Sequence, residues 1–367
     1  MAKRIRLKVL ENYTKSLTEL GMQRYLGHHK VIRFTSEGYP VYSISLPPLL
    51  SPAYANSEIN SKYRVIQNRP LPNLASIALT DVCNAKCEHC SFFNSLDDKT
   101  KEPLSVEEMK DLLRQSQDLG VSVIDFVGGE PLMHPHWREI FESIDKRKSH
   151  VFIFTNGWFL AGAAADLRAS GVGAVYVSLD ASTAELHDRK RGLPGLFDKA
   201  MEGIAAAKKA DLTVGISCCI DEEGFSSGEL DNIIELGRKH GVHEVLVFDA
   251  MPVGRFQKRD DLASEKWSQT TWLDQMMEHV RKYNKDENYP GIYIYAYTTS
   301  YLSNGCTGGT GYFYVSPYGE VCPCDFHHIK YGDVREEKLY MIWDKMTRQL
   351  GRNGSNWTGC WAKQKKE

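Results

Sequence analysis

The sequence predicts an α/β protein: a partial (β/α)6 barrel of the TIM type, preceded by an N-terminal α+β extension and followed by a small C-terminal domain of β-hairpin and helix. Six short apolar runs alternate with amphipathic helical patterns from residue 74 to residue 248. Such alternation is typical of parallel strands joined by right-handed crossovers. The length of 367 residues accommodates one barrel together with smaller terminal pieces.

The N-terminal extension and its connector are assigned to residues 1–72. Leucine and methionine recur with helical spacing over 8–25, and two β-like runs follow at 31–35 and 41–46. The stretch 47–72 is rich in proline, serine and asparagine, so we expect an irregular connector there.

The barrel is assigned to residues 73–258, with its chemistry at the carboxyl ends of the strands. Ser105 and Glu108 form a capping box that marks the first helix start. The expected strands are 74–80, 121–127, 151–155, 174–179, 213–220 and 244–248. The expected helices are 105–119, 136–147, 159–169, 196–209 and 228–240.

The C-terminal domain is assigned to residues 259–367 and begins with an expected long helix at 262–283. A tyrosine- and glycine-rich β region follows, in which Tyr293, Tyr295 and Tyr297 alternate as one face of a strand does. We interpret these tyrosines as core or domain-interface packing rather than as a radical relay. A further helix is expected around Ile342 and Trp343.

The composition is that of a soluble globular protein, with 42% apolar and 25% charged residues and a net charge of −2. This charge gives no reason to expect nucleic acid as a partner. No apolar run is long enough for a signal peptide or a membrane span, so we expect a cytoplasmic protein. Nine cysteines, an odd number, argue against a complete disulfide framework.

Cys83, Cys87 and Cys90 follow the first expected barrel strand with C-x3-C-x2-C spacing. Three thiolates on one loop can hold three corners of a four-iron cluster and leave the fourth iron open to a ligand. His89 could serve as a fourth ligand, but it lies between two thiolates and would strain the loop. The alternatives are buried structural cysteines or a zinc knuckle.

This loop resembles that of the radical S-adenosylmethionine (SAM) superfamily, and so does the sequence Gly128-Gly129-Glu130-Pro131 after the second strand. The resemblance implies a [4Fe-4S] cluster and SAM, whose amino and carboxylate groups chelate the open iron. One electron from the cluster then cleaves SAM to a 5′-deoxyadenosyl radical, which abstracts a hydrogen atom from the substrate. The glycines and Glu130 are implied to hold the SAM amino group.

Further positions fit the same resemblance and are taken as cofactor-binding candidates. Asn156 lies in a turn that the family shares, Ser178 matches a contact to the SAM ribose or carboxylate, and Arg191 is a partner for that carboxylate. His89 is kept in this group. For Ser178 and Asp180 an ordinary helix cap is the alternative, and for Arg191 a surface ion pair.

A second cysteine group comprises Cys306, Cys322, Cys324 and Cys360 and resembles the auxiliary-cluster domains called SPASM or twitch. The cysteines needed for two auxiliary clusters are missing, so we expect one further [4Fe-4S] cluster. Its ligands are Cys306, Cys324 and Cys360, with Cys322 either the fourth ligand or a bystander. Cys322 and Cys324 are two apart and so share a strand face, which favours binding. The alternatives are a four-cysteine zinc site and reduced thiols that pack as small hydrophobic side chains.

Cys218 and Cys219 lie within the fifth expected strand, so one should face the barrel interior and the other should face outward. The inward thiol is a candidate catalytic hydrogen-atom donor, which would make the enzyme an epimerase. Buried free cysteines are the alternative.

The expected function is radical SAM oxidation or bond formation on a peptide or natural product, with a flavodoxin- or ferredoxin-type electron donor. One alternative is an oxidase or epimerase of a small molecule such as a sugar, a lipid or a cofactor precursor. The other is a non-catalytic iron–sulfur or zinc protein, which would leave the Gly128–Glu130 motif without a purpose.

Overall fold

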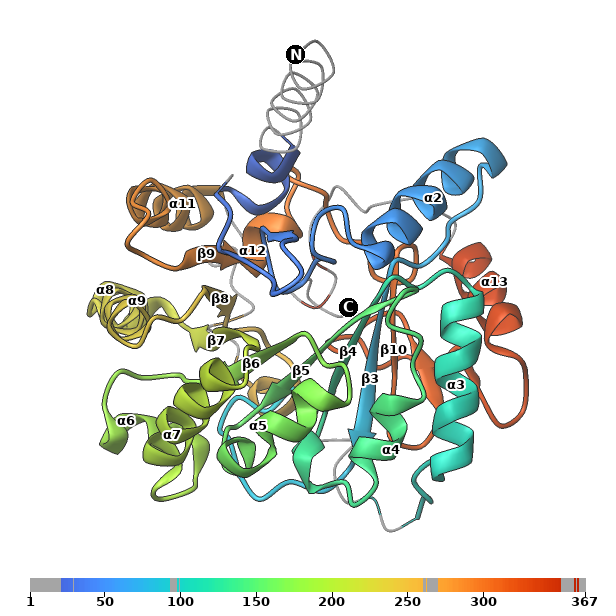
Figure 1. The fold of residues 1–367 in the computed structure, drawn as a ribbon, viewed down its shortest axis with the longest axis horizontal. Helices are drawn as coiled ribbons and strands as arrows, with labels where there is room; N and C mark the ends of the chain where they lie inside the picture. Colours follow the sequence, from blue (N-terminus) through green and yellow to red (C-terminus); the bar gives the residue numbers. More distant parts are fainter. Residues whose placement is uncertain are drawn as a thin grey trace.

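The computed structural model describes residues 21–28, 30–92, 98, 100–259, 262, 270–350, 360 and 362. Ten strands form one sheet in the order β12-β11-β10-β3-β4-β5-β6-β7-β8-β9 (Figure 1). The eight strands β10, β3, β4, β5, β6, β7, β8 and β9 pair in parallel, each with the next in this order. At one edge of the sheet, β11 pairs antiparallel with β10 and with β12. Among the described residues no pairing joins β12 to β9, so the sheet is an open, partial barrel. The predicted fold class is confirmed.

The six predicted barrel strands are all present, and their bounds differ from the predicted ones by no more than two residues. They are β3 (Leu74–Thr80), β4 (Val123–Gly128), β5 (His150–Thr155), β6 (Ala174–Ser178), β7 (Thr213–Ile220) and β8 (Glu244–Asp249). The helices between them are α3 (Val106–Asp118), α4 (Trp137–Glu142), α5 (Leu160–Ala169), α6 (Ala184–Arg191), α7 (Leu196–Lys209), α8 (Glu222–Ser226) and α9 (Glu229–Lys239). The Ser105 capping box on α3 is formed as predicted.

Alternation along the strands divides the core into two layers. The outer face of the sheet packs against the helices through residues such as Ile77, Phe126 and Val175. The inner face lines the lumen, where Phe152 and Tyr176 pack against the N-terminal extension.

The predicted irregular connector is wrong, because residues Pro52–Gln67 form a 16-residue helix, α2. Ser51 caps this helix by accepting a hydrogen bond from the Tyr54 N–H at 3.2 Å, and Pro52 occupies the first turn, where its missing N–H costs nothing. The helix ends at Asn68 in a left-handed conformation. Prolines therefore lie at or beyond the ends of this helix, with Pro52 in its first turn and Pro70 after its last residue, and they do not prevent it from forming. The hairpin of β1 (Arg33–Phe34) and β2 (Pro40–Val41) is present but shorter than predicted.

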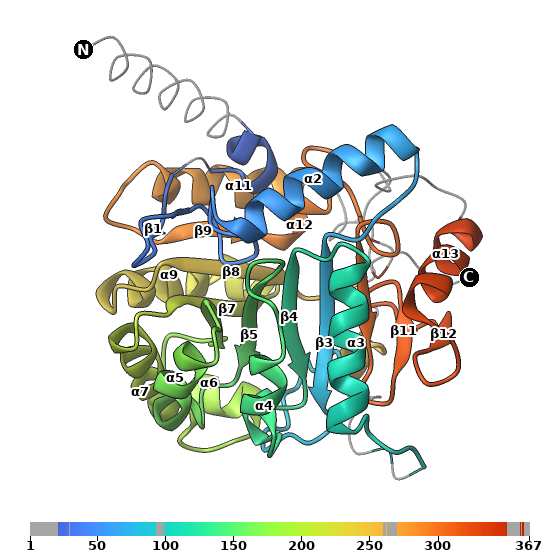
Figure 2. The same ribbon diagram turned by 45° about the vertical axis from the view of Figure 1, so that its right-hand side comes forward.

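The extension covers the amino ends of β3 and β4, opposite to the loop that follows β3 (Figure 2). It is anchored in the lumen by Glu244, whose Oε2 accepts hydrogen bonds from Ser43 Oγ at 3.1 Å, Ile44 N at 2.8 Å and Tyr176 Oη at 2.6 Å. Burial raises the pKa of Glu244 to about 7, although these donors act against the rise.

The C-terminal part continues the barrel sheet on both sides. Its elements are α11 (Thr270–Asn284), β9 (Gly291–Ile294), α12 (Tyr295–Thr298), β10 (Tyr312–Val315), β11 (Glu320–Cys322), β12 (Gly332–Asp333) and α13 (Leu339–Gln349). Residues 263–269 of the predicted long helix, and most of the predicted helix at 8–25, lie outside the described residues. In the part of the chain that the structure describes, no helix is both long and apolar enough to cross a membrane.

The predicted tyrosine strand is wrong beyond Ile294. From Tyr295 the chain turns into α12, because the hydroxyls of Thr298 and Thr299 donate to the Tyr295 carbonyl at 2.9 and 3.1 Å and close a helical turn. The interpretation as packing is confirmed for Tyr293 and Tyr297, which are buried in the core.

Glu244→Gln tests the anchor of the extension through its pH dependence. The pKa of Glu244 is higher in the folded chain than its ordinary value of 4.5, so the folded state favours the protonated form. The free energy of unfolding should therefore fall as pH rises from about 4.5 to above 7, by at most about 3 kcal/mol from this group. An amide at this position cannot ionise, so we expect the variant to lose this part of the pH dependence in urea unfolding between pH 5 and 8. The surface variant Glu202→Gln should keep the wild-type dependence. A Glu244→Gln profile parallel to wild type would contradict the prediction.

Candidate functional site

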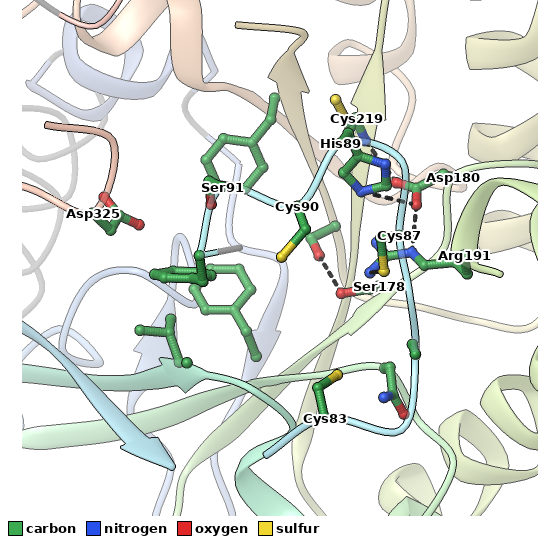
Figure 3. A pocket seen from close by; sticks show the side chains of 18 of the residues that line it. Cys83, Cys87, His89, Cys90, Ser91, Ser178, Asp180, Arg191, Cys219 and Asp325 are labelled. Atoms are coloured by element: carbon green, nitrogen blue, oxygen red, sulfur yellow. Dashed lines mark hydrogen bonds and ion pairs between the residues drawn. The ribbon is translucent and has the colours of Figure 1, made fainter. Parts of the chain in front are cut away.

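A cavity of about 190 Å³ lies at the carboxyl ends of the barrel strands. Its wall contains the cysteine loop after β3 together with residues from the ends of β4 to β8 (Figure 3). The structure brings all the predicted cofactor-binding residues to this one cavity. They are Gly128, Gly129, Glu130, Asn156, Ser178, Arg191 and His89, beside Cys83, Cys87 and Cys90.

The cysteine loop is held through its backbone. Lys86 N–H donates to the Arg191 carbonyl and Glu88 N–H to the Lys190 carbonyl, both at 3.0 Å. On the other side, Arg255 N–H donates to the Cys90 carbonyl at 3.1 Å. A Cβ at Gly254 would lie 2.0 Å from that same carbonyl, so the turn after β8 needs a glycine to contact the loop.

The three loop thiols border the same space and influence one another electrostatically. Burial raises the pKa of Cys83 to about 12 and that of Cys90 to about 11, and the neighbouring thiols add to both rises. Positive charge from iron is what would favour the thiolate forms here. Nowhere among the described residues do three His, Cys, Asp or Glu side chains meet closely enough to hold one metal ion. Ligands at the corners of a four-iron cluster do not have to meet at one point.

Gly128 and Gly129 let the end of β4 lie directly against the start of the cysteine loop. Gly129 N–H donates to the Thr80 carbonyl and Glu130 N–H to the Val82 carbonyl, both at 2.8 Å. A Cβ at Gly129 would lie only 2.0 Å from the Val82 carbonyl oxygen. Gly128 has a φ of +115°, which L side chains rarely adopt. The glycine pair therefore sets where Glu130 lies relative to Cys83.

Glu130 is buried, and three donors from its own chain hold its carboxylate. Thr155 Oγ1 and Asn156 N donate to it at 2.7 Å each, and Leu132 N donates at 3.2 Å. Burial still raises its pKa to about 7. A carboxylate has about four acceptor sites, so room remains for one further donor from a ligand.

Asp180 is the charged centre of the opposite wall. Its Oδ2 accepts from Arg191 Nε at 2.5 Å and lies 3.3 Å from His89 Nε2, while its Oδ1 accepts from Cys219 N at 2.9 Å. Burial acts to raise the pKa of Asp180, but the charge of Arg191 outweighs it and holds that pKa below its ordinary value. Burial lowers the pKa of His89 to about 4, so His89 is neutral at pH 7.

These contacts bear on two alternatives from the sequence, a helix cap for Asp180 and a surface ion pair for Arg191. Asp180 does not cap a helix, since Thr183 holds the N-cap position of α6. Arg191 does not form a surface ion pair, since its side chain is 12% exposed and that of Asp180 is fully buried. Arg191 Nη1 also lies 3.6 Å from the Cys87 sulfur. Nearby, Ser178 Oγ lies 3.4 Å from Ser217 Oγ.

Cys218 and Cys219 face opposite sides of β7, as predicted. Cys218 packs with Ile216 and Ile220 in the outer core and is also among the residues that line the cavity. Cys219 lies on the lumen side of the strand with Ser217, at the cavity wall (Figure 3). Burial raises its pKa well above the ordinary value, so Cys219 keeps its S–H hydrogen.

The second cysteine group borders a larger cavity of about 540 Å³ at the other end of the lumen. Cys306, Cys324 and Cys360 line this cavity, and Cys322 is not among its lining residues. Cys322 packs instead against Ala78 in a small apolar cluster. The strand alternation used to pair Cys322 with Cys324 does not apply, because β11 ends at Cys322.

The two cavities share the residues Phe154, Phe248, Asp325 and Phe326, so they are neighbouring parts of one lumen. Asp325 is partly buried, Tyr312 Oη donates a hydrogen bond to it, and desolvation in this position raises its pKa to about 6. Asp325 is not among the site residues predicted from the sequence. Its position directly after Cys324, in a segment assigned to a cluster, is the sequence feature that could have indicated it.

Gly129→Ala tests the contact between β4 and the cysteine loop. The added methyl group would clash with the Val82 backbone, which has no free rotation to relieve it, so we expect the free energy of unfolding to fall by about 2–4 kcal/mol in urea titration. Gly162→Ala on the exposed face of α5 meets no atom within 4 Å and should instead stabilise the chain by about 0.5–1 kcal/mol. Equal effects of the two substitutions would rule out a specific clash.

Comparisons with known proteins identify two domains. The sequence model of the radical SAM superfamily matches residues 77–236, and that of the SPASM iron–sulfur cluster-binding domain matches residues 306–362. The chain is 29% identical over 290 residues to the AdoMet-dependent heme synthase of Methanosarcina barkeri, which covers 74% of this chain and 82% of that protein. It is 27% identical over 303 residues to the PqqA peptide cyclase of Rhizobium meliloti, and this match covers 79% of this chain and 78% of that protein.

The fold resembles the crystal structure of Streptococcus suis SuiB bound to its precursor peptide SuiA. The TM-score is 0.63 at 16% identity, and the match covers 81% of this chain and 71% of SuiB. At this identity the likeness concerns the fold. The two domain matches include both cysteine groups and the glycine motif after β4. A buried carboxylate with one open acceptor site and an Arg191 side chain held beside Cys87 suit a bound SAM. This chain is thus an enzyme of the radical SAM superfamily with a C-terminal SPASM domain, and its cofactors are a [4Fe-4S] cluster, SAM and auxiliary iron–sulfur.

Proposed function

We propose that this enzyme carries out an oxidative or bond-forming radical modification of a peptide or natural product that binds in the barrel lumen. The observation that carries the proposal is that the two cavities adjoin each other: each borders one cysteine group, and four residues belong to the walls of both cavities. A substrate that reaches from one cavity to the other would contact the hydrogen-abstracting site and the auxiliary site at the same time.

Cys83, Cys87 and Cys90 would hold the first cluster. When bound, this cluster supplies the electron that cleaves SAM to methionine and the 5′-deoxyadenosyl radical. Glu130 is placed to accept from the SAM ammonium with its remaining acceptor site. Arg191, fixed by Asp180 and next to Cys87, is placed to bind the SAM carboxylate.

Asn156 and Ser178 complete the proposed SAM site from the neighbouring strand ends. Asn156 Nδ2 donates to Asn84 Oδ1 at 2.7 Å, which joins the β5 end to the cysteine loop. The Nε2 atom of neutral His89 lies 3.3 Å from Asp180 Oδ2, and His89 would act by fixing that carboxylate. We propose a positioning role for it and no role as an iron ligand.

Aromatic side chains separate the two ends of the lumen. Phe248 packs against Tyr295 and Phe326 with ring centroids 5.1 and 5.9 Å apart, and Tyr295 packs against Phe326 at 5.6 Å. These rings would exclude water from a substrate radical and limit its motion. Cys306, Cys324 and Cys360 would hold one auxiliary cluster on the far side, where it can accept the second electron of a two-electron oxidation.

A peptide substrate is supported by two resemblances: the matched cyclase is named for the PqqA peptide, and SuiB was crystallised with its precursor peptide. The electron donor is proposed to be of the flavodoxin or ferredoxin type. The division into residues 1–72, 73–258 and 259–367 is also part of the proposal.

A small-molecule substrate is the second candidate, and the larger cavity favours it. Ten aromatic side chains line this cavity, and Tyr25, Tyr42 and Tyr54 of the extension are among them. Its volume of about 540 Å³ and its aromatic walls suit a flat conjugated molecule. The resemblance to a heme synthase points to the same class. In either case Cys219 is a candidate hydrogen-atom donor, which would give an epimerase.

The Cys83/Cys87/Cys90→Ala variant tests the two-cluster assignment. After anaerobic reconstitution we expect about eight irons per chain in wild type and about four in the variant, because one four-iron cluster is lost. Formation of 5′-deoxyadenosine from SAM should fall to background in the variant. Far-UV circular dichroism controls for folding. About four irons in wild type and none in the variant would mean that the C-terminal cysteines hold zinc or nothing. Iron-free preparations of both would contradict the proposal.

Deuterium transfer separates the two substrate classes. Extract from cells of the source organism grown in deuterated medium would be supplied with unlabelled SAM, enzyme and reductant. We expect 5′-deoxyadenosine to gain deuterium, measured by mass spectrometry, and the gain to disappear when the extract is first digested with protease. A gain that survives digestion would favour the small molecule. The Cys87→Ala enzyme gives the background.

A further inference from the structure

The cavity that the three cysteines border is also lined by three acids, Glu58, Asp125 and Asp325, and of these Asp325 is the one that directly follows a cysteine of the group. Cys306 and Cys324 lie on either side of Gly308, since a Cβ there would be 3.6 Å from Cys306 Sγ and 3.6 Å from Cys324 Cβ. Cys360 packs in a cluster with Tyr295 and Phe326. Asp325 lies in the chain between Cys324 and Phe326 and borders the same cavity as the three thiols.

Tyr295 joins these groups by direct packing. Its ring lies 5.6 Å from that of Phe326, the residue after Asp325, and both rings pack in the cluster that contains Cys360. Tyr295 also lines the cavity that the three cysteines and Asp325 border. Cys322 is not among the residues that line this cavity and packs in a separate cluster with Ala78 and Tyr314.

We propose that the carboxylate of Asp325, and not the thiolate of Cys322, is the fourth protein ligand of the auxiliary cluster. The proposal rests on the proposed function, in that Cys306, Cys324 and Cys360 hold a cluster. A turn positions the acid: Cys324 and His327 form a β-bridge, with His327 N–H donating to the Cys324 carbonyl at 3.3 Å. Residues 325 and 326 therefore project from the tip of this turn, and both border the lumen.

A carboxylate at one corner has a chemical consequence. Oxygen is a harder ligand than sulfur and binds iron in such a cluster less firmly than a thiolate does. Tyr312 Oη donates a hydrogen bond to Asp325 Oδ1 and would hold this carboxylate in a fixed orientation toward the iron. Asp325 also borders the smaller cavity, next to the proposed hydrogen-abstracting site. A ligand that iron would release readily would therefore lie beside the space proposed for the substrate.

The test uses the full chain with Cys83, Cys87 and Cys90 changed to Ala, in which only the auxiliary cluster remains. Asp325→Ala, Asp325→Cys and Cys322→Ala are each added to this parent. Iron and sulfide per chain are measured after reconstitution, with electron paramagnetic resonance spectra of the oxidised and reduced protein. We expect about four irons in the parent and in Cys322→Ala. Asp325→Ala should fall to about three irons or fewer, with the signal of a three-iron cluster after oxidation.

Asp325→Cys keeps the test decisive if Asp325→Ala folds poorly. A thiolate at this position should restore about four irons and alter the spectrum of the reduced cluster, because sulfur replaces oxygen at one iron. Loss of iron in Cys322→Ala with retention in Asp325→Ala would overturn the proposal, and so would unchanged spectra in all three variants. A parent without iron would overturn it together with the auxiliary cluster. Formation of 5′-deoxyadenosine by the chain with an intact cysteine loop tests the rest of the proposed function separately.

Discussion

The parallel pairing of β10 with β3 is the interaction on which the arrangement of the whole site depends. It runs from Tyr312↔Leu74 to Val315↔Ile77 and joins the C-terminal hairpin to the first barrel strand. The loop that carries Cys83 follows β3, and the turn that carries Cys324 follows the hairpin partner of β10. One ladder of backbone hydrogen bonds therefore sets the position of one cysteine group relative to the other. Phe313 packs on Trp343 behind this ladder, and Trp343 Nε1 donates to the Pro70 carbonyl at 3.0 Å.

Three buried acids in and beyond the barrel strands are stabilised in three different ways. Asp180 lies beside a cation, so it stays charged and holds Arg191 in place. Glu130 has three neutral donors, and its pKa is raised to about 7. Glu244 has a similar pKa but lines neither cavity, and two of its three donors, Ser43 Oγ and Ile44 N, come from the N-terminal extension. Similar carboxyl groups thus differ in protonation and in contacts according to their neighbours.

The two ends of the lumen have walls of different composition. At the carboxyl ends of the strands the wall carries the cysteine loop and the ion pair of Asp180 with Arg191. At the amino ends the extension contributes Tyr25, Tyr42 and Tyr54 to the wall of the larger cavity. These three tyrosines lie outside both domain matches, so this part of the wall comes from residues that neither domain model covers.

The sequence by itself determined the barrel, its strand positions and the cysteine loop, because each is a local pattern: apolar alternation, a capping box, thiols at short spacing on one turn. It could not reveal α2, since proline and asparagine are found equally in connectors and at helix ends. It left Asp180 and Cys322 undecided and did not single out Asp325. The surroundings of such residues depend on partners far away in the chain, such as Cys219 for Asp180 and Ala78 for Cys322. Only the tertiary structure decided these, because burial and distance between remote segments, and not residue type, determine which polar group meets which partner.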